Sequence, residues 1–206
     1  MNPAVETHTM AHIDPLPEDA TEELAEEFEL FEEILGFVPN SLLTMQRKPE
    51  IVEGFRDLTR AVMREADGVD PGLKRLAAHA ASSAAGCQYC EAHSLVAAGV
   101  HGVSDEKLEA LWEYEESEHY TEKERVALEF ALAAGSVPNR VDGELMDEMK
   151  AHWTDDEIVE LLAAISLYGF LNRWNDSLAT DLEDHPREVG ERVLADRGWD
   201  GGKHVD

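Results

Sequence analysis

The two cysteines of this 206-residue chain stand close together in the run Gly86-Cys87-Gln88-Tyr89-Cys90-Glu91-Ala92-His93. Cys90 and His93 are three residues apart, so on a helix they lie on one face. Two thiols at this spacing form a disulfide where the local backbone permits it. A helix N-terminus and a neighbouring cation both favour the thiolate over the thiol. The pattern therefore indicates thiol redox chemistry beside an imidazole.

The residues alone leave two other interpretations of the cysteine pair open. Cys87, Cys90, His93 and His79 would make a tetrahedral zinc set, although their spacing is not that of common zinc modules. Alternatively, the thiols are buried and inert. The redox interpretation needs one thiolate to attack a peroxide or disulfide and the other to resolve the intermediate. We favour it, because a lone closely spaced pair in a cytoplasmic protein is not a disulfide scaffold.

The composition is that of a chain that can bury a sizeable core, with 43% apolar residues. The longest apolar run, residues 161–171, is shorter than the roughly 18 residues of a membrane span. The N-terminus lacks the basic-then-apolar pattern of a signal peptide. We therefore expect a cytoplasmic protein that does not bind membranes.

The chain is strongly acidic, with a net charge of −28 from 45 acidic and 17 basic residues. Nucleic acid is excluded as a partner, because phosphate binding requires basic patches. Self-repulsion destabilises the compact state, and salt screens that repulsion. The charge therefore favours adaptation to a high-salt cytosol, as in halophilic microbes, over an ordinary acidic protein.

This interpretation predicts that salt stabilises the fold. The thermal unfolding midpoint is expected to rise between dilute buffer and about 1 M KCl, where the screening length falls to about 3 Å. Circular dichroism melts at constant pH measure the effect. A protein that unfolds less readily in dilute buffer than in molar KCl would rule out the halophilic interpretation.

Helical periodicity runs through almost the whole chain and no alternating strand is evident, so the predicted fold class is all-α. Residues 1–20 contain three prolines and few apolar residues, and we expect them to form a loose acidic arm before a single helical domain over 21–200. Asp70 and Pro71 predict the start of a helix that Gly86 ends. Thr121 and Thr154 each begin a capping box.

The segments before Gly86 and Gly169 resemble each other faintly, since both are apolar helices with an acidic start. Superposing the two glycines places Cys87 and Cys90 over Phe170 and Arg173. The chain then consists of two pseudo-repeated halves with the chemistry kept in the first. Chance similarity between two buried helices explains the pattern equally well.

The segment from Leu73 through the cysteine motif to His93 resembles the core of the carboxymuconolactone decarboxylase superfamily, in its alkylhydroperoxidase (AhpD-like) branch. Residues 37–40 and 169–176 look like flanking patterns of one subgroup, so the resemblance covers roughly residues 37–183. It implies an oligomeric AhpD-like multi-helix bundle (dimer, trimer or hexamer). It also implies an antioxidant, peroxiredoxin-type thiol peroxidase or disulfide oxidoreductase without metal or organic cofactor.

The resemblance also implies roles for the motif residues. Cys90 would attack the peroxide, Cys87 would resolve the sulfenic acid, and His93 would belong to a proton relay. An external dithiol would then reduce the pair. Tyr89, between the cysteines, would line the pocket or donate a hydrogen bond to a peroxide oxygen, unless it only packs.

Two positions depart from the family pattern. Arg75 stands twelve residues before the first cysteine, where the family relay usually has a glutamate. The family histidine often lies four residues after the second cysteine, where this chain has Ser94, although a three-residue version such as His93 also occurs. The relay implied by the resemblance is therefore incomplete.

A replacement for the missing glutamate is available on the same helix. Arg75, His79, Ser83 and Cys87 are spaced by four and line up on one face. His79 is one turn nearer the thiols and is our candidate for the second relay group, with Glu91 a weaker one. The alternative for His79 is a hydrogen-bonded core histidine.

The run Asn172-Arg173-Trp174-Asn175-Asp176 directly follows an apolar helix. It would form an internal Arg173–Asp176 network, which is costly to bury unless fully paired. Alternatively, the run faces the thiols from the second half of the chain or from a neighbouring subunit.

Two other functions stay open. One is a cofactor-free decarboxylase or lyase of the same superfamily, but such enzymes do not need the thiol pair and an anionic lactone would meet an unfavourable field. The other is a non-catalytic redox sensor or structural oligomer. A sensor would oxidise once, reversibly, and would not cycle with added dithiol.

Overall fold

The computed structural model describes residues 11–64 and 68–205, and within these ranges the chain is helical and holds no strand. The all-α prediction is thereby confirmed. No helix in the described ranges is both long and apolar enough to cross a membrane. The helices are α1 (Ala25–Leu35), α2 (Asn40–Met45), α3 (Pro49–Met63), α4 (Pro71–Ala85), α5 (Gln88–Val100), α6 (Asp105–Glu109), α7 (Glu122–Gly135), α8 (Gly143–His152), α9 (Asp155–Leu178) and α10 (Asp184–Leu194).

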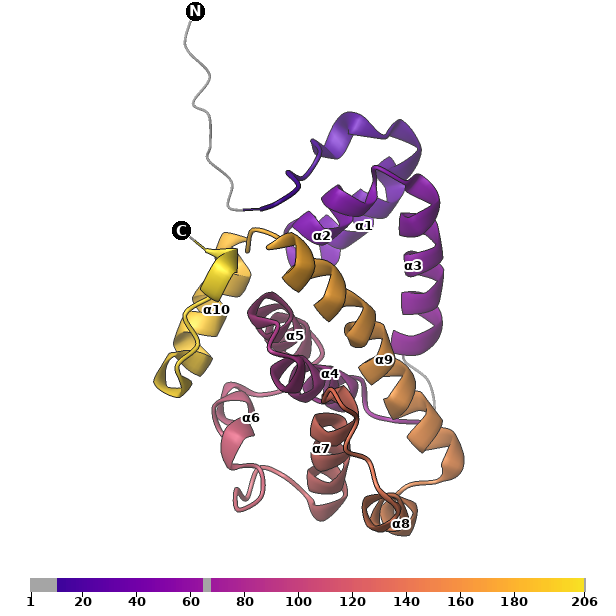
Figure 1. The fold of residues 1–206 in the computed structure, drawn as a ribbon, viewed down its shortest axis with the longest axis vertical. Helices are drawn as coiled ribbons and strands as arrows, with labels where there is room; N and C mark the ends of the chain where they lie inside the picture. The colour runs from indigo at the N-terminus through magenta and orange to yellow at the C-terminus, as the bar shows by residue number, and fades with distance from the viewer. Residues whose placement is uncertain (1–10, 65–67, 206) are drawn as a thin grey trace, which may run out of the picture.

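The helix pair α4 and α5 lies at the centre of the bundle (Figure 1). α4 packs against α5, α7 and α9, while α10 covers α5 and α3 packs on α9. Small side chains allow these close approaches. A Cβ atom at Gly135 of α7 would lie 2.6 Å from the backbone of Ala81 in α4. The two helices that carry the cysteine motif are therefore held on several sides.

The ends of α4 are as the sequence predicts. The Asp70 carboxylate accepts a hydrogen bond from the Leu73 N–H at 2.9 Å, and Pro71 occupies the first helical position. Gly86 ends the helix with φ of 76°, a left-handed conformation that glycine adopts without steric cost. The chain then turns directly into α5, with Cys87 as the N-cap residue.

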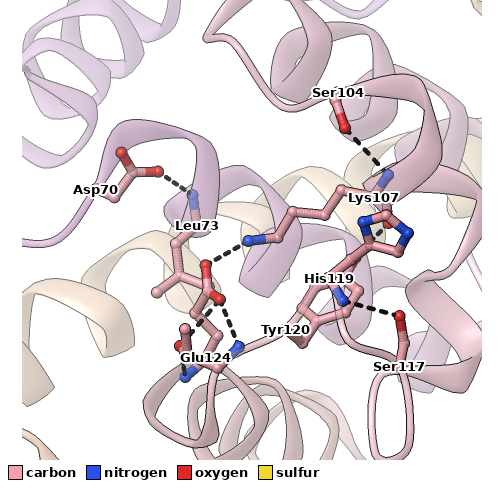
Figure 2. A network of polar contacts seen from close by, with 9 residues as sticks. Asp70, Leu73, Ser104, Lys107, Ser117, His119, Tyr120 and Glu124 are labelled. Atoms are coloured by element: carbon pink, nitrogen blue, oxygen red, sulfur yellow. Dashed lines mark hydrogen bonds and ion pairs between the residues drawn. The ribbon is translucent and has the colours of Figure 1, made fainter.

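The two predicted capping boxes, at Thr121 and Thr154, are both present. Figure 2 shows the first of them, together with the contacts that tie α6 to α7. Lys107 Nζ lies 2.5 Å from Glu124 Oε1, and the Tyr120 hydroxyl donates to the Lys107 carbonyl at 2.6 Å. These contacts fix the long connection that precedes α7.

The N-terminal and C-terminal parts of the described chain lie together. Residues 1–10 of the predicted loose arm lie outside the described residues. From residue 11 the chain is hydrogen-bonded to the body: the Ala11 N–H donates to Asp181 at 3.0 Å, and the Leu16 N–H donates to the Leu43 carbonyl at 3.1 Å. These bonds hold residues 11–16 beside α2 and the segment after α9.

Three helices, α2, α8 and α10, have no counterpart among the sequence predictions. α2 has only six residues, α8 is mostly polar, and Pro186 and Gly190 interrupt the amphipathic pattern of α10. The suggested correspondence of Gly86 with Gly169 does not extend to the helix ends, because Gly169 lies inside α9 whereas Gly86 terminates α4.

Candidate active site

Both cysteines are free and buried at the start of α5. Cys87 is the N-cap residue and Cys90 lies in the first turn, so the positive end of the helix dipole is at the thiols. Tyr168 and Leu171 of α9, together with Leu182, pack against them. The local sequence explains this placement, because Gly86 reverses the chain and α5 begins at once.

The two thiols share a hydrogen bond and differ in acidity. The hydrogen bond with Cys90 lowers the pKa of Cys87 to about 6, and nearby His204 acts in the same direction against the effect of burial. Burial and the Cys87 contact raise the pKa of Cys90 well above its usual value. The first proton lost from the pair therefore leaves the charge mainly on Cys87, and the titration belongs to both groups together.

A cavity of about 700 Å³ opens beside Cys90. Tyr89, His93 and Asn175 line it together with that thiol, and the Asn175 Nδ2 group donates a hydrogen bond to Cys90 Sγ at 3.5 Å. Most of the remaining wall is apolar and comes from three helices: Phe31, Ile34 and Leu35 of α1, Phe55 and Met63 of α3, and Leu167, Tyr168 and Leu171 of α9. Both thiols are buried, and of the two it is Cys90 that lines the cavity.

His93 is held by a carboxylate from a distant part of the chain. Its Nε2 atom lies 2.6 Å from Glu183 Oε2. The other oxygen of Glu183 accepts hydrogen bonds from the Tyr89 hydroxyl at 2.9 Å and the Asn40 N–H at 2.6 Å. The Tyr89 and His93 rings stack with centroids 4.2 Å apart. The imidazole is therefore fixed at the cavity wall.

The charge state of Glu183 follows from these contacts. Burial alone would raise its pKa, but His93 and the backbone N–H of Asn40 bring the pKa below its ordinary value. An ionised carboxylate only accepts hydrogen bonds, so Nε2 of His93 is the donor to Glu183 and Nδ1 is the ring nitrogen left to exchange a proton. This arrangement suits a general base or acid on the wall of the cavity that Cys90 also lines. The Tyr89 hydroxyl donates its hydrogen bond to Glu183 and is therefore not free to donate to a substrate. It is the ring of Tyr89 that contributes to the cavity wall.

His79 does not reach the cavity. Its Nδ1–H donates to the Glu91 carbonyl at 3.0 Å and lies 3.1 Å from Ser94 Oγ, and its ring meets the edge of Trp112. Burial lowers the pKa of His79 to about 4, so the ring is neutral near pH 7. His79, our candidate for the second relay group, is therefore a hydrogen-bonded core histidine between α4 and α5.

Glu91 is the titratable group that lies close to Cys87. Burial raises its pKa to about 7, the Ser83 hydroxyl opposes that shift, and the Cys87 charge adds to it. Of the two relay candidates predicted from the sequence, the one thought weaker is thus the one near a thiol.

Glu91 gives the protein a pH-dependent stability. Its folded pKa is raised from 4.5 to about 7, so its contribution is complete below the unfolded pKa and is lost as the pH rises through about 7. A shift of this size corresponds to roughly 3 kcal/mol. We expect Glu91→Gln to remove most of this loss, so that the variant gains stability relative to wild type between pH 5 and pH 8. Urea unfolding at both pH values measures it, and parallel pH dependences in the two proteins would contradict the assignment.

Arg75 stands where the family pattern has a glutamate, and it too lines the cavity. Its Nη1 group donates to the Pro71 carbonyl at 2.9 Å.

The residues of the polar run at the end of α9 have different partners. Asn175 contacts Cys90, whereas Asp176 pairs with Lys203 at 2.9 Å. Arg173 donates to the Gly169 carbonyl at 3.4 Å rather than to Asp176. The hypothesis of an Arg173–Asp176 pair is therefore not supported, whereas the hypothesis that the run contacts the thiols is correct for Asn175.

Within the described ranges, no group of three or more His, Cys, Asp and Glu side chains is placed to hold a metal ion. The zinc set considered from the sequence is not assembled, because His79 points to Glu91 and Ser94 instead.

Sequence reasoning missed Glu183, Asn40 and His204 as site residues. Glu183 and Asn40 both stand at the start of short helices that the sequence did not predict. Asn40 belongs to one of the flanking family patterns, so the sequence indicated its position but not what it does. Glu183 and His204 carry no motif that connects them to the cysteines.

A protein-family comparison supports the resemblance seen in the sequence. The model of the carboxymuconolactone decarboxylase family matches residues 49–133. The uncharacterized protein YnjA of Escherichia coli K12 is 31% identical over 116 residues, which are 56% of this chain and 63% of that protein. The match thus spans just under two thirds of the length of this curated relative.

Solved structures share the fold over most of the chain. The debrominase Bmp8, solved as a cysteine-to-alanine variant in complex with 2,3,4-tribromopyrrole, has 33% identity and a TM-score of 0.82, covering 88% of this chain and 96% of Bmp8. An uncharacterized peroxidase-related protein with an AhpD core from Ralstonia eutropha JMP134 has 21% identity and a TM-score of 0.76, covering 87% and 95%. The latter establishes an AhpD-like fold. Together with the family model and the cysteine pair of α5, these matches show that the chain belongs to the carboxymuconolactone decarboxylase family.

Proposed function

We propose that this protein is a thiol-dependent peroxidase that reduces apolar organic hydroperoxides and ends each cycle as a Cys87–Cys90 disulfide. The observation that carries the proposal is the placement of Cys90. It is the thiol on the wall of a largely apolar cavity of about 700 Å³, with a second thiol hydrogen-bonded behind it. The carboxylate-held His93 lies on the same wall.

The chemistry balances with these groups alone. His93 takes the proton of Cys90, and the thiolate attacks the terminal oxygen of the hydroperoxide. The O–O bond breaks, Cys90 becomes a sulfenic acid, and His93 returns the proton to the departing alkoxide. Cys87 then attacks the sulfenic sulfur and the hydroxyl leaves as water. Two thiols are oxidised to a disulfide while one hydroperoxide becomes an alcohol and water.

The substrate class follows from the cavity. Phe31, Phe55 and Leu171 line it, and hydrogen peroxide would leave most of this apolar wall uncovered. An organic hydroperoxide gains binding free energy of about 25 cal/mol for each Å² of apolar surface that it buries there. An external dithiol that reduces the disulfide, and assembly into a homo-oligomer, are part of the same proposal.

A second candidate is reductive dehalogenation, favoured by the 33% identity to a debrominase over 96% of that chain. The same two thiols suffice. Cys90 would accept bromine from a brominated ring, so that an S–Br bond forms, the C–Br bond breaks and the carbon takes a proton. Cys87 would then displace bromide to give the disulfide, with an arene and hydrogen bromide as products.

Turnover with defined substrates separates the candidates. The reduced protein, in molar KCl with excess dithiothreitol, is incubated with cumene hydroperoxide, hydrogen peroxide or a polybrominated pyrrole. We expect repeated formation of cumyl alcohol, faster than the consumption of hydrogen peroxide. Bromide release without alcohol would favour the dehalogenase. A single reversible oxidation without cycling would overturn both and leave the sensor.

A further inference from the structure

A second histidine–carboxylate pair lies near the thiols. His204, in the 3₁₀ turn Gly202–His204 near the C-terminal end, is buried with 2% of its surface exposed. Its Nδ1–H donates to the Thr180 carbonyl at 2.8 Å, which leaves Nε2 as a bare acceptor. Among the described residues Nε2 has no hydrogen-bond partner, and Asp176 Oδ1 is 4.0 Å from it.

The segment that carries His204 is fastened across the start of α5. The His204 carbonyl accepts from the Leu182 N–H at 2.8 Å, and the Trp199 indole N–H donates to the Gln88 carbonyl at 3.2 Å. Gln88 directly follows Cys87 in the chain. The Trp199 ring packs so closely on Gly190 of α10 that a Cβ there would lie 2.5 Å from it. The segment of residues 195–205, which lies beside α10 in Figure 1, thus packs against the start of α5, where Cys87 and Gln88 lie.

We propose that His204 accepts the proton of the resolving thiol Cys87 and that Asp176 stabilises the imidazolium that forms. This inference rests on the proposed two-thiol reaction. It assigns one histidine–carboxylate pair to each sulfur. His93 and Glu183 serve Cys90 on the cavity side, whereas His204 and Asp176 serve Cys87 away from the cavity.

The step that His204 assists is disulfide formation. In the reduced protein the Cys87 S–H bond breaks and its proton passes to Nε2 of His204, in line with the lowered pKa of Cys87. The thiolate then attacks the Cys90 sulfur of the sulfenic acid, the S–S bond forms, and the S–O bond breaks. The hydroxide that leaves takes up the proton and becomes water, so that His204 is neutral again.

The surroundings of His204 and Cys87 are consistent with this role. Asp176 also pairs with Lys203, which moderates its charge. The Tyr89 ring lies 5.7 Å from the His204 ring by centroids. Glu91 also lies near Cys87, and a negative charge on its carboxylate opposes the thiolate. The imidazole, together with the hydrogen bond from Cys90, lowers the pKa of the Cys87 thiol.

Rapid-mixing kinetics with His204→Asn test the proposal. Asparagine retains a donor for the Thr180 carbonyl but has no basic nitrogen, and His185→Gln, which changes an exposed histidine of α10, is the matched control. The proposed reaction predicts one phase whose rate depends on the concentration of cumene hydroperoxide and a second phase that does not. We expect His204→Asn to slow the second phase at least about tenfold, to leave the first within about twofold, and to let dimedone trap the sulfenic acid.

A second measurement does not need any peroxide reaction. In a Cys90→Ser background, the iodoacetamide alkylation rate of Cys87 against pH gives its pKa, which His204→Asn should raise and His185→Gln should not change. If the protein lacks peroxidase activity but this difference holds, the proposed function fails and the His204–Cys87 pairing stands. An unchanged Cys87 pKa, or equal slowing of both kinetic phases, would overturn the role of His204.

Discussion

Serine in place of Cys90 is expected to reduce the turnover of cumene hydroperoxide by roughly 10³-fold or more. The reason is that Cys90 is the one of the two thiols that lines the cavity. A serine hydroxyl at the same place keeps the Asn175 contact but is a far weaker nucleophile toward peroxide oxygen. Alcohol formation, measured by chromatography with excess dithiothreitol, reports the loss.

Cys87→Ser is the matched variant for this prediction. Its Cys90 is still able to react, so one alcohol per chain should form quickly and a sulfenic acid should accumulate until a dithiol reaches the cavity. Substantial turnover in Cys90→Ser, or an equal loss of the first turnover in both variants, would contradict the assignment of Cys90 as the attacking thiol.

Glu183→Gln is expected to lower kcat/KM for the hydroperoxide by about 10- to 100-fold, a loss within the range for a perturbed general base. The carboxylate fixes which nitrogen of His93 carries the proton and balances the charge when the ring accepts a second one. A neutral amide does neither as well, and its one carbonyl oxygen must replace two acceptor oxygens for Tyr89, Asn40 and His93.

Two controls separate this effect from general damage. Glu188→Gln changes an exposed glutamate of α10 and should leave the activity unchanged. Tyr89→Phe removes a single hydrogen bond to Glu183 and should cost only a few-fold, because the other two contacts of the carboxylate remain. If Glu183→Gln is folded by circular dichroism and retains wild-type kcat/KM, the His93–Glu183 pair has no part in the reaction.

Local signals in the sequence predicted the helix that leads into the cysteine turn. Asp70, Pro71 and Gly86 act within a few residues of themselves, so their caps are readable without any tertiary structure. The same holds for the capping boxes at Thr121 and Thr154. The helices α2 and α10 have no side-chain cap and owe their formation more to packing, whereas the Asp142 cap of α8 was a local signal that went unused.

The surroundings of the thiols were harder to predict, because they depend on contacts between distant segments. Glu183 is 90 residues from His93, and nothing in its residue type or spacing links the two. The spacing of four residues correctly predicted that His79 lies on the helix that precedes Cys87. However, α5 packs against α4 so closely that the His79 ring bonds the Glu91 carbonyl instead.

The two flanking family patterns acquire physical roles in the structure. The first, residues 37–40, ends in Asn40, whose backbone N–H holds Glu183. The second, residues 169–176, contains Asn175, which donates to Cys90 Sγ. The resemblance indicated that these positions matter, and the fold shows that both converge on the thiol pair.

The central claim is that a single hydroperoxide oxidises both thiols of one chain to a disulfide through Cys90. The most direct measurement is intact-protein and peptide mass spectrometry after mixing the reduced protein with one equivalent of cumene hydroperoxide in molar KCl, with the alcohol quantified in the same sample. We predict one alcohol per chain, the loss of two hydrogens from the protein mass, and a Cys87–Cys90 disulfide in the peptide that contains both. Unchanged free thiols and no alcohol would contradict the claim.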